Sequence, residues 1–168
     1  AVFITKMLPW AVAAPLAGVI VDRYNRRQLM IWTDIARAVV VLGFLLIDTP
    51  GEVPWLYALL TAQVVIGAVF QPAKSASLPN ITTPRELLTA NALMSATWST
   101  MLAVGAALGG LATEAFGTTA VFWIDSATYV VSAVFIYGTT IPQDTKAGEK
   151  SLFRSAVREI TEGWQHLR

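Results

Sequence analysis

The apolar residues of this 168-residue chain fall into long blocks that are separated by short polar segments. We place five blocks, at about residues 2–21, 28–47, 54–72, 87–112 and 119–141. Each is close to or above the roughly 20 residues that a helix needs to cross a bilayer. The pattern therefore predicts an all-α, polytopic membrane protein, with five transmembrane helices within residues 1–142.

The ends of the blocks show where helices stop and start. Pro72, Pro79 and Pro84 lie between the third and fourth blocks, so we expect the third helix to end near Pro72. Thr83 and Glu86 flank Pro84 in the pattern of a helix start, with Thr83 as the N-cap. After Pro142 a polar linker leads to apolar residues at helical spacing, which predicts that residues 143–168 form a cytoplasmic linker and an amphipathic connector helix on the membrane surface.

Lysine and arginine orient the predicted helices. They occur after the first, third and fifth blocks, and none occurs in residues 48–53 or 114–118, which follow the second and fourth. Cytoplasmic loops carry an excess of these residues. We therefore expect the segments after the first, third and fifth blocks to face the cytoplasm.

Composition narrows the function. The chain is 55% hydrophobic and 14% charged, whereas soluble domains carry nearer a quarter of charged residues. A net charge of +1 suggests no nucleic-acid partner. With no cysteine and one histidine, we expect no disulfide, no Cys/His metal site and no cofactor. No histidine cluster, cysteine nucleophile or close carboxylate pair suggests an enzyme.

The segment between the first two blocks is strongly charged. Gly18 and Asp22 are four residues apart and share one helix face, where glycine lets a neighbouring backbone approach. Arg23, Arg26 and Arg27 follow Asp22 within five residues. We interpret this segment as a tight, charged hairpin between two membrane spans.

Two apolar blocks contain charges. Asp34 and Arg37 stand at i, i+3 and can pair on one helix face, which would offset much of the roughly 3 kcal/mol that a bare charge costs in the membrane. They could form a structural ion pair, or a charge relay that locks one conformational state of the protein; we leave both open. Asp125 lies about two turns into the fifth block, where a structural role is favoured over proton binding.

The fourth block is rich in glycine and alanine. Gly105, Gly109 and Gly110 form a small-residue face that suits close packing of helices. No Gly-Lys-Ser/Thr follows this run, so it is not a phosphate-binding loop.

Three motifs resemble those of one transporter family. Gly18 to Arg27 resembles the loop signature between the second and third helices of the major facilitator superfamily, with Asn25 where the family often has glycine. Asparagine also tolerates a left-handed backbone, so we expect the turn to be preserved. The segment from Phe70 to Asn91 resembles the branch of enterobactin-type siderophore exporters and macrolide-efflux-like proteins. Residues 105–110 resemble the antiporter signature of helix five, although Ala106 replaces the usual proline.

The resemblance implies a fold and a function. The chain would supply helices two to six and the central cytoplasmic loop of a twelve-helix transporter in the bacterial inner membrane. One further helix would precede residue 1, and a C-terminal half would follow. Such proteins rock two halves around a central site and use an ion gradient. The implied function is proton-coupled efflux of lipophilic small molecules; a non-transporting scaffold or sensor on the same fold is the alternative.

The resemblance also implies roles for individual residues. Asp22 would be the acid of a latch that grips the partner half, with Arg23, Arg26 and Arg27 as its counter-charges. Gly18 would be the contact point. Asp34 and Asp125 are the candidates for carrying a proton.

Overall fold

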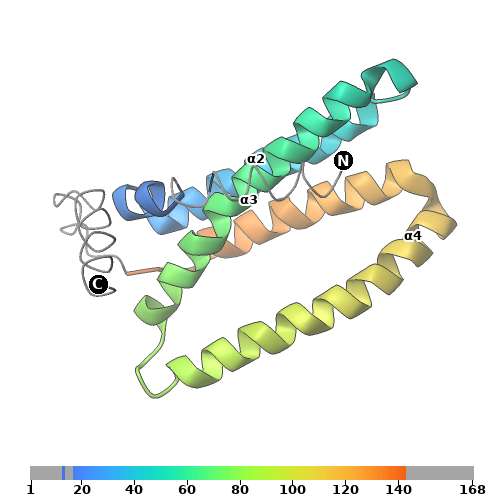
Figure 1. Cartoon of the computed structure of the whole chain (residues 1–168). Coiled ribbons are helices and arrows are strands. Elements are labelled where there is room, and N and C mark those ends of the chain that lie inside the picture. The colour runs from blue at the N-terminus through green and yellow to red at the C-terminus, as the bar shows by residue number, and fades with distance from the viewer. Residues whose placement is uncertain (1–12, 14–16, 143–168) are drawn as a thin grey trace, which may run out of the picture.

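The computed structural model describes residue 13 and residues 17–142, and every regular element within them is helical (Figure 1). Three of these helices are long and apolar enough to cross a membrane. The expectation of an all-α, polytopic membrane protein is confirmed. Most of the first predicted span and the predicted connector over 143–168 lie outside the described residues.

Helix α2 (Arg26–Gly43) begins within the charged hairpin, at the first of its two adjacent arginines. Asn25 is its N-cap, and its side-chain oxygen accepts a hydrogen bond from the backbone nitrogen of Gln28 at 3.1 Å. With φ −64° and ψ 116°, Asn25 has extended rather than left-handed backbone. The chain does turn here, as expected, but Asn25 takes part in the turn as a helix cap and not through left-handed backbone.

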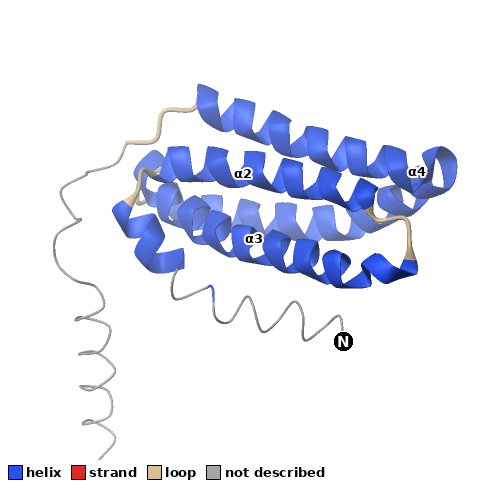
Figure 2. Cartoon of the chain, turned by 90° about the horizontal axis from the view of Figure 1, so that it is seen from above, coloured by secondary structure: helices blue, strands red, loops and turns tan. Residues whose placement is uncertain are grey.

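A short turn at the opposite end reverses the chain. It contains two 3-10 helices, η1 (Phe44–Leu46) and η2 (Pro50–Glu52). One carboxylate oxygen of Glu52 accepts hydrogen bonds from the backbone nitrogens of Asp48 at 2.8 Å and Thr49 at 3.1 Å. Helix α3 (Val53–Ile81) then returns alongside α2 (Figure 2).

Helix α3 continues past the point where it was expected to end. It is 29 residues long and includes Pro72 and Pro79. A proline removes one backbone hydrogen bond, but a membrane helix can continue through it where the surrounding structure and local adjustments compensate for the freed carbonyl. The prediction that proline ends the third helix was therefore wrong.

The next turn is closed by Thr83 and Glu86. The backbone nitrogen and the hydroxyl of Thr83 both donate to the Glu86 carboxylate, at 3.0 and 2.7 Å. These bonds lower the pKa of Glu86 below its ordinary value. Helix α4 (Leu87–Gly138) begins after this turn, with Glu86 as N-cap, so it starts three residues later than the sequence suggested at Pro84.

Helix α4 doubles back on itself at Gly117. This is its one residue with non-helical backbone, at φ 78° and ψ 164°. The predicted connection over 114–118 is therefore reduced to a single bend, and two arms, 87–116 and 118–138, run back past each other (Figure 1). The second arm packs against α2, whereas most side chains between residues 91 and 119 are exposed.

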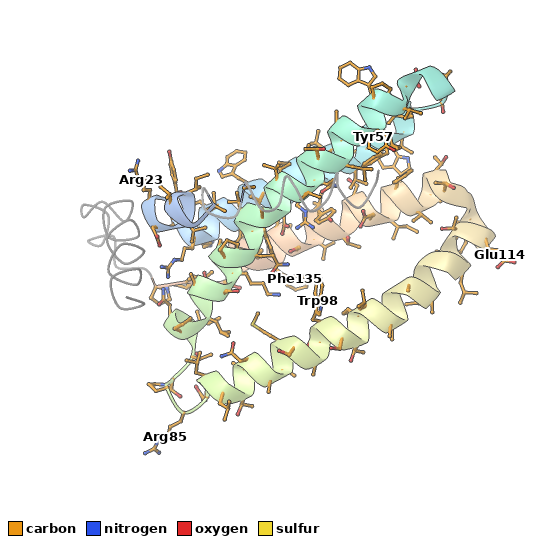
Figure 3. The ribbon with its side chains drawn as sticks, in the orientation of Figure 1. Arg23, Tyr57, Arg85, Trp98, Glu114 and Phe135 are labelled. Atoms are coloured by element: carbon orange, nitrogen blue, oxygen red, sulfur yellow. The ribbon has the colours of Figure 1, made fainter. Side chains whose placement is uncertain are left out.

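A small apolar core lies at the end of the molecule that carries the charged hairpin. Val21, Met30 and Ala73 are buried together there, with Ile136 and Ile141 packed against them. Arg23 and Arg85 lie at this end of the molecule and Glu114 at the opposite end (Figure 3). The core thus joins the start of α2, the second half of α3 and the end of α4.

Candidate functional site

Two adjacent arginines of the charged hairpin (Asp22 to Arg27) bind different helices. Nη1 of Arg26 donates to the carbonyl oxygen of Ala76 in α3 at 2.8 Å. Nε of Arg27 donates to that of Ile136 in α4 at 3.3 Å, and its Nη2 donates to that of Tyr137. The Arg27 guanidinium also lies 5.1 Å from the centre of the Tyr137 ring. The hairpin therefore fixes the ends of both neighbouring helices.

The other charged residues of the hairpin, Asp22 and Arg23, differ from Arg26 and Arg27 in their surroundings. Asp22 and Arg23 are exposed, and within the described residues Asp22 forms no ion pair with Arg23 or Arg27. A side-chain carbon built at Gly18 meets no atom of the described structure within 4 Å. Asp22 and Gly18 are thus available to a partner, while Arg27 is engaged within the chain rather than as a counter-charge of Asp22.

A second polar cluster lies within the apolar helices, where α2 supplies both charges. Nη1 of Arg37 lies 3.9 Å from Oδ1 of Asp34. Asp34 is only 1% exposed, and its Oδ2 accepts a hydrogen bond from the Ser132 hydroxyl at 2.6 Å. A buried carboxylate requires such partners, because transfer of a bare charge out of water is unfavourable. The pair on α2 is therefore bound to the second arm of α4.

Arg37 connects all three long helices. Its Nη2 donates to the Tyr129 hydroxyl of α4 at 2.9 Å, and its guanidinium lies 4.4 Å from the centre of that ring. The Phe70 ring of α3 lies 5.7 Å away on another side. Gln63, also in α3, donates to the backbone carbonyl of Arg37 at 3.2 Å. Aromatic rings and a hydroxyl thus surround a cation that stands among apolar helices.

The sequence alone did not single out Gln63 or Ser132 as members of this cluster. Each is a polar residue inside an apolar block, and that contrast is the signal that could have identified them. Ser126, which follows Asp125, donates from its hydroxyl to the carbonyl oxygen of Ala38 at 3.1 Å. The contacts between α2 and α4 therefore include several buried polar ones.

Asp125 stands apart from this cluster. It is exposed on the second arm of α4, and its carboxylate has no hydrogen bond or ion pair within the described residues. The two candidate proton carriers therefore differ: Asp34 is buried and bonded, whereas Asp125 is open.

The small-residue face of α4 has no partner within the described structure. A side-chain carbon built at Gly105, Gly109 or Gly110 meets no atom there within 4 Å. The arm that carries these glycines also exposes Trp98, Leu102 and Leu108. The described residues thus leave an apolar helix face uncovered.

One pocket lies at the end opposite the hairpin, between α2 and α3. It encloses about 330 Å³ and is lined by Gly43, Leu46, Ile47, Glu52, Trp55 and Leu59. Apart from Glu52 its walls are apolar, so it suits an apolar group and offers little to a polar one.

Comparison with known proteins identifies the family. Residues 2–168 match the Major Facilitator Superfamily. The chain therefore belongs to this superfamily of membrane transporters, as the hairpin motif and the segment from Phe70 to Asn91 indicated.

Similar proteins include named exporters. "Uncharacterized MFS-type transporter YfiS" of Bacillus subtilis (strain 168) is 30% identical over 164 residues, which cover 96% of this chain and 38% of YfiS. "Putative bacilysin exporter BacE" of Bacillus amyloliquefaciens is 35% identical over 123 residues, 73% of this chain and 30% of BacE. "Macrolide efflux protein A" of Streptococcus pyogenes is 28% identical over 165 residues, 96% of this chain and 40% of that protein.

The chain spans less than half the length of these three relatives. No solved structure matches it.

Proposed function

We propose that this chain is part of a secondary active transporter that exports lipophilic small molecules in exchange for protons by alternating access. The observation that carries the proposal is the buried Asp34 beside the partly buried Arg37 in α2, in a chain that belongs to a transporter family. Charges inside membrane helices are unfavourable and mark ion or substrate pathways. The names of the relatives BacE and macrolide efflux protein A support export as the direction.

The proposal includes the architecture of the whole protein. Residues 1–142 provide five membrane helices of one half-bundle, and residues 143–168 provide a linker and a connector helix on the cytoplasmic side. A second half packs against the uncovered face of α4 that carries Gly105, Gly109 and Gly110. The segments that contain Arg23 and Arg85 face the cytoplasm, which fits their common end of the molecule (Figure 3).

In this mechanism the charged hairpin is the latch. Asp22 is exposed and has no ion pair within the described residues, so its carboxylate is free to bind a group on the second half. Gly18, one turn earlier on the same helix face, leaves room for that half to approach. The latch closes when the cavity faces outward and opens when it faces inward.

Two acids are available for proton coupling. The charge of Asp34 is balanced by Arg37, and its carboxylate accepts a hydrogen bond from Ser132 of α4, so its protonation would weaken the link between α2 and α4. Asp125 has no such partners in the described structure and could take a proton without breaking a bond. The proposal assigns coupling to one of these two.

The test is transport of a lipophilic dye into inside-out vesicles that contain the complete transporter. We expect uptake that needs a proton gradient and that is lost in Asp22→Asn. The control is Asp48→Asn, because Asp48 is also exposed but lies in the turn at the opposite end. Uptake retained in Asp22→Asn would remove Asp22 from the mechanism. Absence of gradient-driven uptake for every dye and siderophore tried would favour the scaffold alternative.

A further inference from the structure

The end of α4 is tied to the charged hairpin through the carbonyl groups of its last turn. The last four carbonyls of a helix lack the regular partner four residues further along. Arg27 donates to two of these four, those of Ile136 and Tyr137, and the Ile136 carbonyl also accepts from the backbone nitrogen of Thr139 at 3.1 Å. A guanidinium is also favoured at this position by the negative end of the helix dipole. Arg27 therefore acts as a cap for a helix more than 100 residues later in the chain.

The segment that follows α4 is held at two more points. The side-chain nitrogen of Asn80, near the end of α3, donates to the carbonyl oxygen of Pro142 at 2.9 Å. Between these points, Ile141 packs against the buried cluster that contains Val21 and Met30. Residues 136–142, which we name the exit segment, are thus attached to the hairpin and to the helices that flank it.

The three arginines of the charged hairpin differ in their contacts with the rest of the chain. Arg26 binds the carbonyl oxygen of Ala76 in α3, and Arg23 is exposed without a hydrogen bond in the described part of the chain. Arg27 donates to two carbonyl oxygens of α4. Three arginines that look alike in the sequence therefore occupy three different environments.

We propose that Arg27 is a positioning residue that couples the charged hairpin to the exit segment, so that the two move as one body. Any displacement of the hairpin is then passed to the chain where it leaves α4. This coupling rests on contacts within the described chain and holds whether or not the latch and the proton coupling proposed above are correct.

The test measures the distance between the two parts directly. The chain has no cysteine, so spin labels can be placed by Gln28→Cys in the first turn of α2 and Thr140→Cys in the exit segment, both exposed positions. In the 168-residue chain in lipid nanodiscs, we expect one narrow distance distribution. Arg27→Ala should abolish the narrow peak, because the cap is lost. Arg27→Lys should restore part of it, since lysine keeps the charge but lacks the two-pronged donor geometry.

Two controls separate the tether from a general loss of structure. Arg23→Ala removes a nearby arginine with no hydrogen bond in the described residues, and should leave the distribution unchanged. A second label pair, Val39→Cys and Val134→Cys, reports the packing of α2 against α4 and should be unaffected by Arg27→Ala. A narrow Gln28–Thr140 distribution in Arg27→Ala would overturn the proposal. So would equal broadening of both label pairs, because the effect would then be unfolding.

Discussion

Asp34 depends on partners from its own helix and from α4. It is almost fully buried, lies 3.9 Å from Arg37 and accepts a hydrogen bond from Ser132. Replacing one member of a buried pair leaves the other charge uncompensated, which typically costs about 3–5 kcal/mol. We therefore predict that Asp34→Ala lowers the stability of the chain by an amount in this range, measured by unfolding in mild detergent.

Two variants test the reason for that loss. In Asp34→Ala/Arg37→Met the buried charge is gone, so the double variant should recover much of the lost stability. Asp125→Ala should have a small effect, because the Asp125 carboxylate has no hydrogen bond within the described residues. Equal losses in Asp34→Ala and Asp125→Ala would contradict the assigned role of Asp34.

The carboxylate of Glu52 makes the stability of the turn between α2 and α3 depend on pH. Its carboxylate accepts hydrogen bonds from the backbone nitrogens of Thr49 and Asp48, and these lower its pKa below the ordinary value of 4.5. A group whose pKa falls on folding stabilises the fold above its unfolded pKa, and the stabilisation is lost as pH falls through the folded pKa. We predict that the turn between α2 and α3 is intact at neutral pH and loosens only well below pH 4.5.

The measurement is a pH series of unfolding temperatures for the native chain and Glu52→Gln. The difference in unfolding temperature between the native chain and Glu52→Gln should be constant near neutral pH and should shrink in acid. Glu114→Gln is the matched control, since Glu114 is an exposed acid at the same end with no hydrogen bond in the described residues. A difference that grows as the pH falls would show that the sign is wrong.

Among the helices, the bend in α4 depends on one glycine. Gly117 has φ 78° and ψ 164°, a region of backbone conformation that is essentially restricted to glycine. A side chain there is strained, whatever space surrounds it, by about 1–3 kcal/mol. We predict that Gly117→Ala destabilises the reversal between the two arms, measured as loss of stability in detergent unfolding.

The control for this prediction is another glycine of the same helix. Gly105 has helical backbone and open space around it in the described structure, so Gly105→Ala should be neutral or slightly stabilising in the isolated chain. A Gly117→Ala variant as stable as Gly105→Ala would mean that the arms do not require this bend.

The helices were predictable from the sequence, but several of their ends were not. Apolar blocks locate membrane helices because hydrocarbon excludes unpaired backbone groups, which is why α2, α3 and both arms of α4 lie close to the predicted blocks. Pro72 was expected to end α3 because local rules treat proline as a breaker. The helix nevertheless includes Pro72 and Pro79, because tolerance of proline in a membrane helix depends on the folded surroundings, which no local rule includes.

The polar cluster around Arg37 was likewise only partly predictable from the sequence. The spacing of Asp34 and Arg37 was enough to propose a pair, since i, i+3 residues share a helix face. Tyr129 and Ser132 complete the cluster from positions more than 90 residues away, which the spacing of residues could not reveal. The distinct contacts of Arg23, Arg26 and Arg27 likewise arise from packing, because nothing in a run of arginines separates one from another.

For the whole molecule, the first arm of α4 is the informative part. Most of its side chains are exposed, and its small-residue face has no neighbour within the described structure. Transporters of this family type work by moving two halves around a shared central site. The chain covers 38% of YfiS and 30% of BacE, which supports the proposal that a second half is required.

We therefore predict that residues 1–168 alone cannot transport. Vesicles that contain only this chain should accumulate no more lipophilic dye under a proton gradient than protein-free vesicles, because one half-bundle cannot alternate access to a site that lies between two. The positive control is the complete transporter in the same vesicles, and a second control confirms that the 168-residue chain is inserted. Gradient-driven accumulation by the inserted chain alone would refute the two-half mechanism, and the uncovered arm would then have to be explained by association of two copies.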